Sequence, residues 1–157
     1  MIRTFNKQDI DYVIESHCRI YNKEYNFDES FNSFIFDSVS SFLETYEPTK
    51  ENVWLIDVDG ETKGSIGIVK VSDETAQLRW FLIETDQRGK GYGKLLIQKS
   101  IDFCKANGYK TIILWTNHLF VSARKMYALF GFNIVETKTQ FLSNQNVVEE
   151  RWELQLG

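Results

Sequence analysis

The sequence predicts a single α/β (α+β) domain in which a mixed, mostly antiparallel sheet carries helices on both faces. Two apolar runs, Val53–Val58 and Lys63–Val71, are joined by Asp59-Gly60, a dipeptide typical of a two-residue hairpin turn. A third run, Ala76–Glu84, leads through a glycine-rich segment into a helical pattern, and a strand–helix–strand unit of this kind is parallel. The 157 residues suffice for one domain with a buried core.

The elements before the hairpin are a short strand and two helices. Ile2–Phe5 reads as a strand, and Asn6 is a good N-cap for a helix over Lys7–Asn22. A second helix is expected over about Phe31–Glu44, where apolar residues recur at helical spacing.

The elements after the glycine-rich segment alternate between helix and strand. A helix from Gly91 ends at Asn107-Gly108, a strong stop signal. The expected strand, helix, strand and closing strand are, in order, Lys110–Thr116, Leu119–Phe130, Phe132–Thr137 and Glu149–Leu156.

Composition narrows the class of protein. The net charge of −4 argues against nucleic acid as a partner, and no apolar run approaches the length of a membrane span. Cys18 and Cys104 lack the spacing of metal ligands and read as reduced, buried thiols. Met1–Asp11 has no apolar core of signal-peptide length, so we expect a cytoplasmic protein with no metal and no membrane partner.

The segment Arg88–Gly93 reads R-G-K-G-Y-G and lies between the run Leu78–Ile83 and a helix. Glycines in such a turn leave backbone N–H groups free, and the helix dipole adds positive potential, so the turn predicts a phosphate site. A dinucleotide fingerprint is excluded because its sixth position is Lys94 instead of glycine. A P-loop is excluded because Leu95 follows Lys94 where Ser or Thr is needed.

A second signature lies downstream, where the helical run from Ala123 ends in Tyr127-x-x-x-Gly131-Phe132. Gly131 fits the left-handed residue that terminates a helix. Tyr127 taken alone is more often a packed aromatic. The two signatures occur with a strand-like run, Thr111–Trp115, between them.

In these two signatures the chain resembles the GNAT superfamily of acyl-CoA N-acyltransferases, whose pyrophosphate loop has the pattern Gln/Arg-x-x-Gly-x-Gly. The resemblance covers essentially the whole chain as one GNAT-like N-acetyltransferase domain, residues 1–157. It is closest to the acetyltransferase domains found fused to MarR-type regulators. The stretches that carry this closer likeness are Tyr25–Phe31, Gln77–Trp80, Leu114–Asn117 and Trp152–Leu154.

The resemblance implies direct transfer of an acetyl group from acetyl-CoA to a primary amine. The implied coenzyme A residues are Leu82, Ile83, Glu84, Arg88, Gly89, Lys90, Gly91, Tyr92, Gly93, Lys94, Asn117 and Tyr127. A strand N–H, that of Leu82, is expected to polarise the thioester carbonyl, and Tyr127 is expected to protonate the leaving thiolate. Asn117 is expected to replace an asparagine that many relatives carry at the position of Phe120.

The sequence offers no single residue as the general base. Many relatives have a glutamate where this chain has Gln77, which cannot act as a base. Glu84 and His118 are the nearest candidates, and for each the alternative is a solvated strand-end charge or a loop residue. A water relay is an equal alternative.

The acceptor is expected to contact the segment Tyr21–Phe31, which mixes carboxylates with aromatic rings and therefore suits a cationic amine. The expected contacts are Glu24, Tyr25, Phe27 and Asp28, with Arg79 holding any substrate carboxylate. The alternative is that these groups only pack and solvate the connection. Alternation along the strand places Arg79 on the face of Phe81 and Ile83, where an internal ion pair is its alternative role.

A competing function is a non-catalytic acyl-CoA-binding regulatory module, because the cofactor loop would be the same. The sequence leaves open the identity of the small-molecule or peptide amine, the length of the acyl group and the oligomeric state, with a homodimer as one option.

Overall fold

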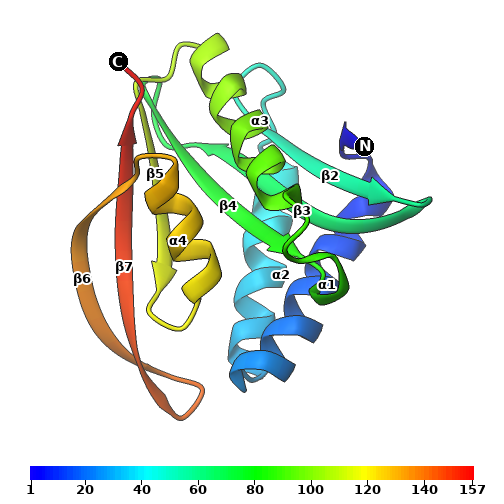
Figure 1. Ribbon diagram of the computed structural model, residues 1–157, viewed down its shortest axis with the longest axis vertical. Helices are drawn as coiled ribbons and strands as arrows, with labels where there is room; N and C mark the ends of the chain where they lie inside the picture. The colour runs from blue at the N-terminus through cyan, green and yellow to red at the C-terminus, as the bar shows by residue number, and fades with distance from the viewer.

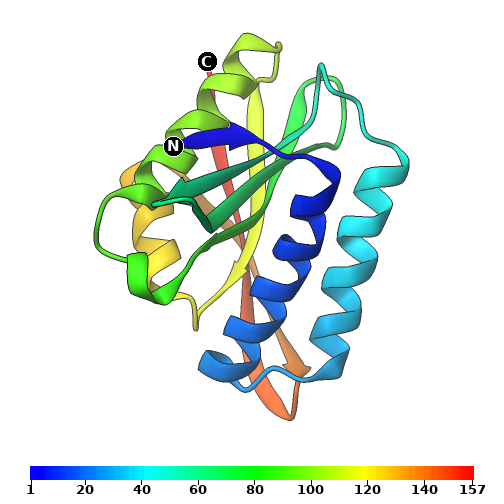
Figure 2. The same ribbon diagram turned by 90° about the vertical axis from the view of Figure 1, so that its right-hand side faces the viewer.

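The computed structural model describes all 157 residues as a seven-stranded sheet between two layers of helices (Figures 1 and 2). The strand order is β1-β2-β3-β4-β5-β7-β6. The elements are β1 (Ile2–Thr4), α1 (Lys7–Tyr25), α2 (Glu29–Glu44), β2 (Asn52–Val58), β3 (Glu61–Lys70), β4 (Thr75–Ile83), the 3-10 turn η1 (Thr85–Gln87), α3 (Tyr92–Ala106), β5 (Thr111–Asn117), α4 (Val121–Leu129), β6 (Asn133–Leu142) and β7 (Gln145–Gln155).

The predicted fold class is confirmed. Only β4 and β5 are parallel, and the other neighbouring strands are antiparallel. Figure 2 shows α1 and α2 on one face of the sheet and α3 and α4 on the other. None of these helices has both the length and the apolar character needed to cross a membrane.

The start of α1 is held by a network of charged and amide groups. The Asn6 side chain accepts the N–H groups of Gln8 and Asp9, and the Asp9 carboxylate accepts the Asn6 N–H, which completes a capping box. Arg3 of β1 binds the same Asp9 carboxylate at 2.7 Å and also binds Asp57 of β2 at 2.7 Å. This network fastens α1 to the edge of the sheet.

Two tight hairpins differ in how visible they are in the sequence. Asp59 and Gly60 both adopt positive φ, 53° and 81°, so the predicted two-residue turn between β2 and β3 is confirmed. Ser143 and Asn144 form the same kind of turn, with φ of 49° and 60°, between β6 and β7. The predicted strands, which stop at Thr137 and start at Glu149, are too short, because the Ser143-Asn144 turn lets the pairing of β6 and β7 continue to the tip of the hairpin.

A β-bulge in β4 changes which side chains share a face. Trp80 has φ of +52°, and the register against β3 shifts there, so strict alternation fails. Trp80 joins the core beneath α1 and α2, whereas Phe81 and Ile83 pack against the core beneath α3. The expectation that Arg79 shares the face of Phe81 and Ile83 rests on unbroken alternation, which the bulge removes.

The two parallel strands separate soon after they meet. β4 and β5 pair only at Thr75–Thr111, Ala76–Ile112 and Gln77–Ile113, although both strands continue for several residues. Figure 1 shows them diverging toward the end at which the glycine-rich loop lies. We call the unpaired stretch between them the strand gap. It leaves backbone groups of β4 without a partner strand.

We predict that Arg3→Met weakens the acid sensitivity of folding. Hydrogen bonds from Arg3 lower the pKa of Asp9 and of Asp57, and burial only partly opposes them. The folded carboxylates therefore bind fewer protons than the unfolded chain, so their contribution is complete above about pH 5 and is lost as the pH falls through the lowered values. Urea unfolding across this range should show a shallower loss of stability in Arg3→Met than in wild type. Lys110→Met, in an exposed pair with Glu74, is the control and should retain the wild-type slope.

Candidate functional site

The glycine-rich loop forms a cradle of free backbone N–H groups at the end of β4. Gly89 and Gly91 have φ of 78° and 86°, and Gly91 is the N-cap of α3 without any side-chain cap. The first helical bond of α3 is donated by Leu95 to Gly91, and no N–H from residue 89 to residue 94 has an acceptor within the chain. Such a run of donors at a helix N-terminus binds anions, above all phosphates. The residues predicted for the pyrophosphate loop are thus brought together in space.

The cationic side chains around the cradle differ in their partners. Arg88 is held by Glu24 at the end of α1, with N–O distances of 2.9 and 3.2 Å, and by the carbonyl oxygen of Ile83 at 3.2 Å. Lys90 donates to Gln87 at 3.1 Å, whereas Lys94 has no ion pair. The ion pair joins two groups that the sequence assigned to different ligands, Arg88 to the cofactor and Glu24 to the acceptor.

The backbone of β4 beyond the bulge exposes alternate peptide groups to the strand gap. The Glu84 N–H donates to the carbonyl of Lys63 in β3 at 2.9 Å, so Glu84 and, two residues earlier, Leu82 face β3. The N–H of Ile83 therefore faces the gap. The expected carbonyl donor, the N–H of Leu82, is directed into the sheet instead, and Leu82 contributes a buried side chain.

Tyr127 is placed at the gap from the opposite side by α4. The helix ends in a Schellman motif, in which Phe132 N–H donates to the Tyr127 carbonyl and Gly131 N–H to that of Ala128. Gly131 has φ of 95°, as the predicted helix terminator requires. The Tyr127 ring contacts Phe81 of β4 at 6.0 Å between centroids, and its hydroxyl has no hydrogen-bond partner within the chain. Burial raises the pKa of Tyr127, so the hydroxyl stays protonated.

A buried ion pair that the sequence did not suggest holds α4 against the sheet. Arg124 donates two hydrogen bonds to Glu150 of β7, at 2.8 and 2.9 Å, and Trp152 donates a third to the same carboxylate. The Glu150 side chain is only 5% exposed. Because Tyr127 lies one turn beyond Arg124, this pair fixes the position of the Tyr127 ring.

Glu84 is poorly suited to act as a base. Its carboxylate accepts two hydrogen bonds from Arg19, at 2.9 and 3.0 Å, and one from the hydroxyl of Tyr12 at 2.7 Å. Burial would raise the pKa of Glu84, but the hydrogen bonds from Arg19 and Tyr12 outweigh it and leave that pKa below its usual value. In the structure Glu84 therefore connects the end of β4 to α1.

His118 has a similar limitation. Its Nδ1 accepts the backbone N–H of Val148 at 3.0 Å, so the neutral ring carries its proton on Nε2 and has no free lone pair. Asn117, which is buried beside it, accepts the N–H of Leu119 through its side-chain oxygen. These bonds shape the turn from β5 into α4, while the Asn117 amide nitrogen makes no bond within the chain.

The expected acceptor segment is divided in the structure. Asp28 is the N-cap of α2 and accepts from Ser30 and from Ser143 at the tip of the last hairpin. Phe27 is buried, and Tyr25 lends its carbonyl to Gln145 of β7. Asp28 is exposed, but it lies at the tip of that hairpin, whereas Glu24 pairs with Arg88 of the cradle and its neighbour Tyr25 is half-buried.

An aromatic cluster joins this segment to α4, and its central member was not predicted. The ring of Tyr21 lies 4.9 Å from that of Phe120 and 5.2 Å from that of Phe31, and Tyr25 and Phe27 complete the cluster. Phe120 thus packs against α1 where many relatives were expected to have an asparagine. Residues at i and i+4 on α1, Tyr21 and Tyr25, were a usable signal for this cluster.

Arg79 lies apart from the other acceptor candidates. Its guanidinium donates to the side chain of Gln77 at 2.8 Å and lies over the Trp80 ring, whose N–H in turn donates to Ser38 of α2. Burial lowers the pKa of Arg79, opposed by the charge of Glu51. These contacts hold Arg79 within the fold, but its partner is the Gln77 amide and not the carboxylate of the internal ion pair that the sequence left as the alternative.

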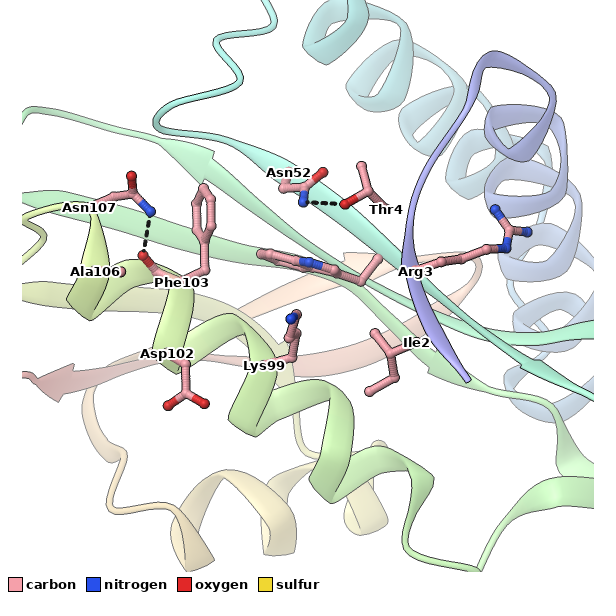
Figure 3. A pocket seen from close by; sticks show the side chains of 10 residues that line it. Ile2, Arg3, Thr4, Asn52, Lys99, Asp102, Phe103, Ala106 and Asn107 are labelled. Carbon is pink, nitrogen blue, oxygen red and sulfur yellow. Dashed lines mark hydrogen bonds between the residues drawn. The ribbon is translucent and has the colours of Figure 1, made fainter.

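A separate cavity of about 520 Å³ lies between the edge of the sheet and the far side of α3 (Figure 3). Trp54 and Phe103 line it, and Lys99 points into it while Asp102 points away. None of the cofactor or acceptor candidates lines this cavity. It is therefore distinct from the site at the strand gap.

Comparison with known families and structures is consistent with this geometry. The family model described as "Acetyltransferase (GNAT) family" matches residues 11–132 of the chain. The acetyltransferase of the GNAT family from Staphylococcus aureus Mu50 superposes with a TM-score of 0.82 at 20% identity, covering 100% of this chain and 99% of that one. The structure of yncA from Salmonella typhimurium with its cofactor acetyl-CoA gives 0.75 at 16% identity, covering 100% and 94%.

The curated relatives match part of this chain and a smaller part of their own length. N-acetylaspartate synthetase from Danio rerio is 30% identical over 59% of this chain and 34% of its own length. N-acetyltransferase 8B from Homo sapiens is 27% identical over 50% of this chain and 37% of its own. The chain spans about a third of the length of these relatives.

We predict that Glu150→Gln lowers the free energy of unfolding by about 1–3 kcal/mol, because it leaves the partly buried guanidinium of Arg124 without a counter-charge. Chemical denaturation measures the change. Glu136→Gln is the matched control, since Glu136 meets Arg151 at 4.0 Å on the exposed surface, and it should stay within about 0.5 kcal/mol of wild type. Equal effects of the two variants would contradict the anchoring role of Glu150.

Proposed function

The chain belongs to the acetyltransferase (GNAT) family, and we propose that it transfers an acetyl group from acetyl-CoA directly to a primary amine. We assign this activity to one domain spanning residues 1–157. The observation that carries the proposal is the cradle of free N–H groups at residues 89–94, at the mouth of the strand gap.

The residues present fit coenzyme A. Its pyrophosphate matches the donors of the cradle together with Lys90 and Lys94, and Gly91 leaves the approach to them open because nothing lies within 4 Å of its Cβ position. Its extended amide-bearing arm matches the peptide groups that β4 leaves unpaired in the gap. When bound, acetyl-CoA supplies the activated acetyl group.

The chain's own groups account for the remaining tasks. A backbone N–H of β4 in the gap, such as that of Ile83, stabilises negative charge on the carbonyl oxygen, a contribution of about 3 kcal/mol for an aimed donor. Tyr127 supplies a neutral hydroxyl for the leaving sulfur. Asn117 offers its free amide nitrogen on the other side of the gap.

The acceptor in this proposal is a small-molecule or peptide amine that enters over the end of α1. Glu24 supplies negative charge there, and Tyr25 and Phe27 supply aromatic surface. Asp28 contributes by capping α2. Arg79 already donates to Gln77 and lies over the Trp80 ring, so it is not the first choice to bind a substrate carboxylate. One relative is named N-acetylaspartate synthetase. The product in that name is an N-acetylated amino acid, which supports an amine as the acceptor here.

One specific observation favours a second function, an acyl-CoA-binding regulatory module without catalysis. Neither candidate suits the role of a base, because the Glu84 carboxylate is bound by Arg19 and Tyr12 and the Nδ1 lone pair of His118 accepts the Val148 N–H. Release of free thiol from acetyl-CoA in the presence of a panel of primary amines separates the two functions.

We predict that two loop variants lose acetyl-CoA affinity. Arg88→Glu places a negative charge at the cradle, and Gly91→Val puts a branched side chain where φ is 86° and fills the open approach. Calorimetry should show at least about a tenfold weaker Kd for each, or about 1.4 kcal/mol. Lys105→Glu, at the far end of α3, carries the same change of charge and should bind as wild type does. Unchanged affinity in both loop variants would place coenzyme A elsewhere.

We predict that Glu24→Gln raises the KM for the amine by about tenfold, corresponding to about 1.4 kcal/mol of lost attraction. Asp28→Asn should have little effect, because asparagine caps a helix as well as aspartate does. Steady-state kinetics with both substrates varied measures the two effects. Since Glu24 also holds Arg88, the KM for acetyl-CoA is measured in parallel. A variant that alters only this second value would limit Glu24 to the cofactor loop.

A further inference from the structure

The ion pair between Glu24 and Arg88 connects the helical layer over one face of the sheet to the loop after β4. Glu24 lies in the last turn of α1, and Arg88 comes directly before the first N–H donor of the cradle. Their N–O distances are 2.9 and 3.2 Å, and their side chains are 23% and 42% exposed. Ligands on either side of this pair can therefore reach one of its members.

Each member of the pair is the only oppositely charged partner of the other. Glu24 meets no second cation, and Arg88 meets no second carboxylate. Asp86, two residues before Arg88, is paired with Lys63 at 3.1 Å instead. The charge of Glu24 is therefore available to a cationic ligand only to the extent that Arg88 gives it up.

The donors of Arg88 are unequally used. Nη1 donates to both carboxylate oxygens of Glu24, and Nε donates to the carbonyl of Ile83, whereas Nη2 has no acceptor within the chain. Arginine binds phosphate most strongly when two N–H groups of its planar fork meet two oxygens. A phosphate held by the Nη1–Nη2 end of the fork thus competes with Glu24 for Nη1.

We propose that Glu24 couples the two substrates by exchanging one partner for another. The pyrophosphate of coenzyme A engages the fork of Arg88, and the released Glu24 carboxylate then binds the ammonium group of the acceptor. This inference rests on the proposed acetyltransferase function and deepens it. The coupling is reciprocal, because an amine bound to Glu24 in turn releases Arg88 to the pyrophosphate.

The first test is calorimetry of coenzyme A binding to Glu24→Gln. The affinity should rise about threefold to fivefold, the range that a partly exposed ion pair supports, because nothing then competes with the pyrophosphate for Arg88. Asp86→Asn is the matched control, since it removes a carboxylate close to Arg88 in the chain without releasing that arginine, and it should bind as wild type does. A merely structural role of Glu24 would weaken binding, so the sign of the change separates the two roles.

Two further comparisons assign the effect to Arg88 and to the pyrophosphate. In an Arg88→Met background, Glu24→Gln should change the affinity no more than Asp86→Asn does. Dephospho-coenzyme A retains the pyrophosphate and should show the full gain in Glu24→Gln. Pantetheine lacks the pyrophosphate and should show none.

The acceptor half of the proposal needs an amine, and the probe is the primary amine that releases thiol fastest from acetyl-CoA. Its binding is measured with and without coenzyme A, which has no acetyl group to transfer. Wild type should bind this amine about threefold to fivefold more tightly when coenzyme A is present. Glu24→Gln should bind it equally in both conditions.

Several outcomes would overturn the exchange. They are unchanged or weaker coenzyme A binding in Glu24→Gln, an equal gain in Asp86→Asn, and a wild-type amine affinity that coenzyme A does not alter. If no amine releases thiol, the proposed function fails together with the acceptor half of the exchange, whereas the calorimetry still decides whether Glu24 competes for Arg88. If wild type turns over and Glu24→Gln binds coenzyme A as wild type does, only the exchange fails.

Discussion

The separation of β4 from β5 is the constraint on which the site depends. A parallel pair would normally continue its ladder, yet pairing stops at Gln77 and Ile113. Beyond that point the bulge at Trp80 turns β4 away and changes which side chains face each layer. Gly67 on β3 makes the bulge sterically feasible, because a Cβ there would lie 2.6 Å from the Trp80 ring. The glycine-rich cradle, the free peptide groups and Tyr127 are useful together only because the strands part.

The polar groups near the gap are divided between structure and chemistry. The carboxylates of Glu84 and Glu150 are each engaged by an arginine, and Asp28 is engaged as a helix cap. What remains uncommitted consists of backbone N–H groups, the Asn117 amide nitrogen, the Lys94 ammonium and the neutral hydroxyl of Tyr127. This division explains why a site without a free base can still suit a reaction whose net proton transfer runs from one substrate to the other.

Much of the fold was predictable because its signals are local. The Asp59-Gly60 turn, the Asn6 cap and the Gly131 terminator are each set by residues adjacent in the chain. The features that were missed depend on residues far apart, such as the bulge at Trp80 and the pair between Arg124 and Glu150. The Ser143-Asn144 turn is local, but serine rarely adopts positive φ, so it gave only a weak signal.

The candidate site shows the same contrast. The residues of the cradle follow from one sequence motif and are brought together by the fold. The base candidates failed because a sequence gives the position of a carboxylate or imidazole and not its partners: Arg19, which binds Glu84, lies 65 positions away, and Val148, which binds His118, lies 30 away. Tyr21 lies within the predicted acceptor segment, but the rings around it come from α2 and from the turn before α4, which the local sequence does not show.

The connection between α1 and α2 acts as a tie across the open end of the sheet. On one side Glu24 holds Arg88 of the loop after β4, and on the other the peptide group of Tyr25 and the cap residue Asp28 hold the hairpin that follows β6. The two halves of the sheet lack a shared ladder there, so the distance between them is set by the length of this short segment. An insertion or deletion in it would alter the span of the opening while leaving every strand register unchanged.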